Sequence, residues 1–149
     1  MELKTFLIEA KGHSYATGEE GKKLADGSKE FVYSAHGYTY RDRYLGEDPF
    51  IGEEIIWDEK HVIWGMNFYG RVLSDAVPAG EVYTFLQKAM RLVREDRPFR
   101  GPEKFSEGDF AYVDENQGTV NGFMGTEKIF FKGEEVYRLD YHGGAVKPA

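Results

Sequence analysis

Two glutamates, Glu54 and Glu127, occupy equivalent places in two similar segments, residues 50–56 and 123–129. Each segment carries Phe, Gly, Glu and Ile at every second position. Because side chains on a strand alternate between faces, these four residues share one face of each predicted strand. A carboxylate among apolar neighbours could bind a cation, and two close carboxylates with separated pKa values could act as acid and base. The alternative is structural: each glutamate accepts hydrogen bonds from tyrosine hydroxyls or loop amides.

Aromatic residues and aspartates on the neighbouring strands complete the predicted ligand-binding set. The same alternation groups Tyr40 with Asp42, and Tyr112 with Asp114, in the strand before each glutamate. Trp64 and Tyr137 occupy equivalent places in the strand after it. If the two segments face each other, aromatic walls around two acids would suit a small cationic or amphipathic ligand. Asp42 and Asp114 also fit a structural role, since aspartate near a strand end commonly closes a turn.

Other chemical signals are weak. His142 lies two residues after Asp140 and could be a general base, although a solvated sheet edge explains this pattern more simply. The four histidines have no metal-ligand spacing, so no metal is expected. The chain contains neither a phosphate-binding glycine loop that opens a helix nor a Gly-x-Ser-x-Gly motif. The sequence therefore predicts no cofactor and disfavours a serine hydrolase.

The repeated segments belong to a longer internal similarity. Residues 33–46 match 105–118 at a shift of 72, and residues 50–70 match 123–143 at a shift of 73. Apolar stripes of helical spacing precede both stretches, near residues 3–10 and 82–93. We therefore predict one domain of two repeats, at about 1–72 and 79–146, each a helix followed by a three-stranded antiparallel meander. The first strand of each meander is expected near residues 30–44 and 104–115. The expected fold is α+β, an α-βββ-α-βββ chain forming a curved antiparallel sheet of about six strands with two helices packed on it. Residues 143–149 are expected to form a loose tail.

Composition narrows the class of partner. The 149 residues carry a net charge of −7, which disfavours nucleic acid or anionic membrane as a direct partner. No apolar run approaches the roughly 20 residues that a membrane-spanning helix needs, and no signal-peptide pattern opens the chain. Cysteine is absent, which fits a reducing compartment. These features predict a soluble cytoplasmic protein.

Several longer motifs together resemble a known family. They lie at residues 38–46, 50–54, 64–70, 98–102 and 141–144. With them the chain resembles an uncharacterised prokaryotic domain family, found as stand-alone small proteins or as the C-terminal partner of an Xre-type helix-turn-helix domain. The resemblance implies an effector-binding or dimerising module with a sensing role, and it carries over no site residues. This chain shows no helix-turn-helix segment, so DNA binding would need a separate protein.

The leading prediction is a non-enzymatic domain that binds a small ligand in an acidic, aromatic pocket shared by the two repeats. One alternative is a small-molecule hydrolase or isomerase that uses Glu54 and Glu127 as acid and base. Another is an interaction or dimerisation module without a ligand, for which a homodimer is the simplest assembly.

Overall fold

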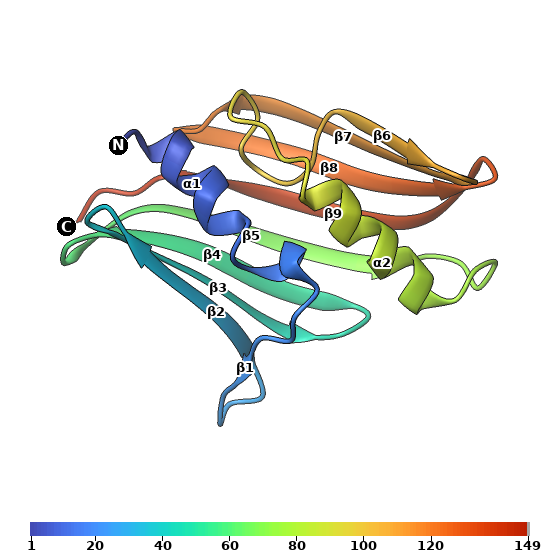
Figure 1. Cartoon of the computed structure of the whole chain (residues 1–149), viewed down its shortest axis with the longest axis horizontal. Helices are drawn as coiled ribbons and strands as arrows, with labels where there is room; N and C mark the ends of the chain where they lie inside the picture. The colour runs from blue at the N-terminus through green and yellow to red at the C-terminus, as the bar shows by residue number, and fades with distance from the viewer. Residues whose placement is uncertain (149) are drawn as a thin grey trace.

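The computed structural model describes residues 1–148, and within them the chain forms one nine-stranded antiparallel sheet with two α-helices (Figure 1). The strand order across the sheet is β1-β2-β3-β4-β5-β9-β8-β7-β6. The helices are α1 (Leu3–Lys11) and α2 (Ala79–Met90), and a 3₁₀ turn, η1, spans Tyr15–Thr17. The strands are β1 (Lys22–Lys23), β2 (Lys29–Ala35), β3 (Tyr38–Gly46), β4 (Phe50–Asp58), β5 (His61–Val72), β6 (Lys104–Glu107), β7 (Phe110–Thr119), β8 (Gly122–Phe131) and β9 (Glu134–Ala145).

The long strands β5 and β9 join the two halves of the sheet. They pair in antiparallel register from Trp64 opposite Ala145 to Val72 opposite Tyr137. Strands β1 to β5 lie on one side of this seam, and β6 to β9 lie on the other. Both helices lie on the same face of the sheet, and the opposite face carries no helix in the part of the chain described (Figure 1).

The core lies between the helices and the face of the sheet that they cover. Apolar residues at helical spacing bury one side of each helix, including Phe6 and Leu7 on α1 and Phe85 and Leu86 on α2. Inward residues of the strands pack against them, and they include Tyr40, Ile56, Trp64, Tyr112, Ile129 and Tyr137. Removing one such apolar side chain from water stabilises the fold by about 1.5–3 kcal/mol.

The predicted helix-plus-three-strand repeat and its count of about six strands are wrong. The stretch read as one strand near 30–44 is two strands, β2 and β3, joined at His36 and Gly37, which have φ of 57° and 82°. The stretch near 104–115 likewise divides into β6 and β7 at Gly108, with φ of 59°. Positive φ at successive residues is the geometry of a tight hairpin turn, and a His-Gly pair signals it weakly compared with Asn-Gly. The predicted internal duplication stays a prediction.

The predicted loose tail is wrong for its first residues. Gly143 and Gly144 belong to β9 and pair with Met66 and Gly65 of β5. A Cβ atom on Gly143 would overlap the Gly65 carbonyl, so glycine allows this close approach of two backbones. The two central strands of the sheet therefore remain paired to the end of β9.

Among residues 1–148, neither helix has the length and apolar character required to cross a membrane.

Candidate functional site

Glu54 lies on β4 beneath α1, and its side chain is 2% exposed. Its Oε1 atom accepts hydrogen bonds from the Tyr40 hydroxyl at 2.5 Å and from Lys11 Nζ at 2.6 Å. Lys11 ends α1 and also donates to the Phe99 carbonyl at 2.7 Å. A buried ion pair is tolerated when remaining donors are satisfied in this way. The charge of Glu54 is thus offset by a buried lysine.

Glu127 occupies the same register position on β8 and is fully buried. Arg100 binds it through both carboxylate oxygens, with Nε at 3.1 Å and Nη2 at 2.9 Å. The hydroxyls of Tyr112 and Tyr137 donate to the same carboxylate at 2.6 and 2.9 Å. Burial, followed by the charge of Glu127, raises the pKa of both tyrosines well above its ordinary value. Burial disfavours the charged form of Arg100, but Glu127 holds the pKa of Arg100 above its ordinary range.

The loop at residues 99–100 joins these two clusters, since the Phe99 carbonyl accepts a hydrogen bond from Lys11 Nζ and Arg100 binds Glu127. Each predicted glutamate is therefore inward-facing and surrounded by hydrogen-bond donors. The arrangement fixes α1 and this loop to the sheet. Trp64, in contrast, donates its indole N–H to the Val120 carbonyl at 2.9 Å and contacts neither glutamate by a hydrogen bond.

The two predicted aspartates differ in their partners. Asp42 lies opposite Glu54 in the sheet, and Asp114 lies opposite Glu127. Asp114 Oδ1 accepts the Tyr141 hydroxyl at 2.7 Å. In the other half of the sheet, the corresponding residue is Phe68, which has no hydroxyl. Asp42 Oδ1 is accordingly buried without a hydrogen-bond partner among residues 1–148.

The correspondence between Phe68 and Tyr141 follows from the register of the strands. Phe68 lies opposite Gly52, and Tyr141 lies opposite Gly125. In both cases the ring tip covers the glycine, where a Cβ atom would collide with it. The two rings therefore cover the glycine of the neighbouring strand in the same way, and only Tyr141 carries a hydroxyl that can donate a hydrogen bond.

Burial of Asp42, together with the nearby charge of Glu54, raises the pKa of its carboxyl to about 7. Burial and Glu127 raise the pKa of Asp114 to about 7 as well. A carboxyl with this pKa changes its charge near neutral pH, which is common at binding and catalytic sites. Asp114 Oδ2 is also buried without a hydrogen-bond partner, but it lies 3.8 Å from Arg97 Nη2. Asp42 forms no ion pair within residues 1–148, so its carboxylate is the less compensated of the two.

Asp42 lines a cavity of about 360 Å³ on the helix-covered face. Strands β3 and β4, the turn η1 and the first turn of α2 surround it. Its aromatic walls are Tyr15, Tyr44, Phe50, Phe68 and Tyr83. Its ionisable residues are Lys29, Asp42, Glu47, Asp48 and Arg100. The lining does not include Glu54 or Glu127, so this cavity differs from the predicted hollow between the two glutamates.

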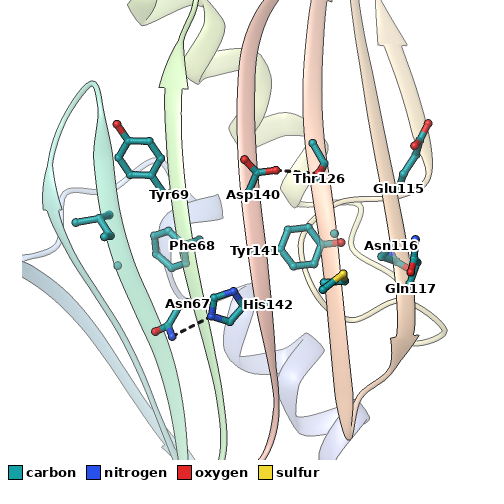
Figure 2. A pocket seen from close by; sticks show the side chains of 14 residues that line it. Asn67, Phe68, Tyr69, Glu115, Asn116, Gln117, Thr126, Asp140, Tyr141 and His142 are labelled. Carbon is teal, nitrogen blue, oxygen red and sulfur yellow. Dashed lines mark hydrogen bonds between the residues drawn. The ribbon is translucent and has the colours of Figure 1, made fainter.

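A second hollow, of about 830 Å³, lies on the helix-free face across β4, β5, β9, β8 and β7 (Figure 2). His142 and Asn67 point toward one another there, with His142 Nε2 3.4 Å from Asn67 Nδ2. Asp140 accepts the Thr126 hydroxyl at 2.9 Å. Asp140 therefore does not orient His142 as a general base would require, and both side chains are exposed, as expected of a solvated surface.

Sequence reasoning missed Lys11, Arg100 and Tyr15. Lys11 follows the apolar stripe of α1 by one residue, and Arg100 lies in a loop between two prolines. The signal that could have found them is electrostatic, because two buried carboxylates require two buried cations. Within the described residues, no three His, Asp or Glu side chains gather into a group that could hold a metal ion.

Comparison with curated proteins and with solved structures finds no significant match. Residues 42–146 match the family described as a domain of unknown function, DUF5680. The match runs from Asp42 on β3 to just beyond the end of β9, and it includes Arg100 and both glutamates. The expectation of an uncharacterised family is thus confirmed: the chain belongs to the DUF5680 family.

Proposed function

We propose that this chain binds a small amphipathic molecule carrying a protonated amine, and that Asp42 is the ionic anchor. The observation that carries the proposal is that Asp42 lines a cavity while its buried Oδ1 atom has no hydrogen-bond partner in residues 1–148. A buried polar atom left without a partner costs about 1–3 kcal/mol. A ligand that donates a hydrogen bond to this atom would recover that cost.

The cavity walls support a cation with an apolar body. Five aromatic rings line the space, and a cation over such a ring gains about 0.5–2 kcal/mol. Arg100 does not give the cavity a free positive charge, because Glu127 binds it through both oxygens. Glu47 and Asp48 add negative charge to the lining against the single cation of Lys29. A volume of about 360 Å³ is at the small end of ligand pockets.

The ion pairs make the glutamates poor candidates for acid–base catalysis. Glu54 and Glu127 each accept hydrogen bonds from a cation and from at least one tyrosine. General acid–base catalysis requires a carboxylate that reaches the substrate, and both of these carboxylates are buried and paired with a cation. A binding role at Asp42 is therefore favoured. The resemblance to domains that follow Xre-type regulators supports a sensing role for such binding.

Three probes of similar size and different charge test this proposal: phenethylamine, phenethyl alcohol and phenylacetate. The amine should raise the melting temperature at pH 8, and the other two should have much smaller effects. A ligand at 100 times its Kd adds about 2.7 kcal/mol of stability, or roughly 5–10 °C for a domain of this size.

Asp42→Asn and Asp114→Asn form a matched pair, since each change removes one buried carboxylate at an equivalent register position. Asp42→Asn should abolish the effect of the amine, and Asp114→Asn should preserve it. Equal losses in the two variants, or a larger shift with phenylacetate than with phenethylamine, would contradict the proposed anchor.

A further inference from the structure

Three cations lie directly opposite one another on the helix-free face of the sheet. Arg71 on β5 pairs with Arg138 on β9, and Arg138 pairs with Lys128 on β8. All three side chains are half-buried. Like charges placed directly opposite on neighbouring strands destabilise a sheet. In a chain with 26 acidic and 19 basic residues, this basic row (Arg71, Arg138 and Lys128) runs against the overall charge.

The surrounding acids neutralise the basic row only in part. Glu135 binds Arg138 at 2.9 and 3.1 Å. Arg71 lies over the Tyr69 ring at 5.8 Å, and neither Arg71 nor Lys128 forms an ion pair within residues 1–148. Asp140, two residues beyond Arg138, accepts a hydrogen bond from Thr126. Two positive charges on this face are therefore available to a negatively charged partner.

An apolar surface adjoins the basic row. Ile51, Tyr69 and Met124 all line the hollow of about 830 Å³ on this face, here called the groove (Figure 2), and these residues are 53%, 42% and 58% exposed. The groove crosses five strands, a width of about 19 Å at roughly 4.8 Å per strand. A helix of about 13 residues has this length at 1.5 Å per residue. Exposed Tyr, Met and Arg are also the residue types enriched at protein interfaces.

We infer that the helix-free face binds an amphipathic helix of a partner protein. Its acidic flank would lie over the basic row, and its apolar side chains would enter the groove beside Ile51, Tyr69 and Met124. The basic row selects an acidic flank on the side of the helix that lies over it, and Glu115 and Asp140, which line the groove, disfavour acidic side chains on the side that enters it. The two helices of this chain bury their own apolar stripes in its core, so a folded second copy does not supply the occupant.

The test is a titration of the ¹⁵N-labelled full chain with a synthetic amphipathic helix of about 14 residues, carrying a leucine stripe flanked by glutamates. The same peptide with lysine at every glutamate position is the charge control. We expect the acidic peptide to shift amide resonances of β5, β9 and β8, with weaker binding at high salt. The lysine peptide should bind much more weakly.

A matched pair of double variants locates the surface. Arg71→Glu with Lys128→Glu should weaken binding of the acidic peptide about ten-fold or more. Lys22→Glu with Lys23→Glu makes the same change in charge on the exposed strand β1 and should leave the affinity unchanged. Circular dichroism of both variants confirms that they remain folded.

Three outcomes would overturn this inference. They are equal binding of the acidic and basic peptides, an equal loss of affinity in the two double variants, and no resonance shift at about 1 mM peptide, a concentration that detects even weak complexes. Resonances of the same face that shift with protein concentration alone would favour a homodimer instead. None of these results bears on amine binding at Asp42, which lies on the opposite face.

Discussion

Replacing Phe68 by tyrosine should give Asp42 the hydrogen bond that it lacks. Tyr141 makes this bond to Asp114 at 2.7 Å in the other half of the sheet. Phe68 and Tyr141 lie opposite glycines at equivalent register positions, so a hydroxyl on the Phe68 ring should reach Asp42 Oδ1. The cavity beside Phe68 provides space for the added atom.

The expected gain in stability follows from the charge of the acceptor. A hydrogen bond to a charged group contributes about 1.5–3 kcal/mol, which corresponds to roughly 3–12 °C in melting temperature for a domain of about 150 residues. The new hydroxyl should also lower the pKa of Asp42, as the Tyr141 hydroxyl acts to lower the pKa of Asp114. The gain should therefore be largest above pH 7, where Asp42 is ionised.

Urea denaturation at pH 8 and pH 5 measures this effect. Phe68→Tyr should raise the free energy of unfolding more at pH 8 than at pH 5, and it should weaken amine binding because Oδ1 is occupied. Asp42→Asn in the same background should remove most of the gain. A gain that persists without the Asp42 carboxylate, or a Phe68→Tyr variant that is no more stable and binds the amine unchanged, would refute the reasoning.

Three further predictions concern the stability of the fold. Lys11→Met leaves the Glu54 carboxylate buried without its cation and should cost about 3–5 kcal/mol in urea denaturation. Burial and Glu54 raise the pKa of Asp42 from 3.8 to about 7, so between these values the folded state binds more protons than the unfolded state. Stability should therefore fall as pH rises from about 4 to 7, by at most about 1.4 kcal/mol per pH unit for this group, and Asp42→Asn should reduce that slope. Gly125→Ala places a methyl group against the Tyr141 ring and should cost about 1–3 kcal/mol in thermal unfolding.

Each of these predictions has a control. Lys11→Met combined with Glu54→Gln should recover part of the loss, because no charge is then left buried alone. Gly122→Ala is the control for Gly125→Ala, since a Cβ atom at residue 122 meets no atom within 4 Å. Equal effects of the two alanine substitutions would contradict the packing argument, as would an unchanged pH slope in Asp42→Asn.

The sequence was sufficient to predict the inward acids and their tyrosine neighbours. Alternation along the strands placed Glu54 with Tyr40, and Glu127 with Tyr112, on a common face, and in the structure these tyrosines donate to those glutamates. Such pairs lie within two neighbouring strands, where the register follows from the local pattern. Both apolar helix stripes were also predictable, because their spacing is a local pattern within one segment.

The remaining features depend on contacts between distant segments or on single turn residues. Lys11 and Glu54 are 43 residues apart, and no local pattern connects them. The strand count failed at His36 and Gly108, where positive φ divides two apparent strands. The candidate site depends on one missing hydroxyl group. Phe68 lies at the position that Tyr141 occupies in the other half of the sheet, and phenylalanine cannot donate a hydrogen bond to Asp42. The sequence shows the difference between Phe68 and Tyr141, but the loss of a hydrogen bond is significant only because both aspartates are buried, which is known from the structure.

Proton release on amine binding tests the proposed anchor most directly. Burial and Glu54 raise the pKa of Asp42 to about 7, so at pH 6 most of the chains carry a protonated Asp42. An ammonium group requires the ionised carboxylate, so binding should release nearly one proton per ligand at pH 6 and almost none well above pH 8. Calorimetry of phenethylamine binding in buffers of different ionisation enthalpy counts these protons. Release that declines with pH and disappears in Asp42→Asn is the predicted result, and binding with no release at pH 6 would contradict the account.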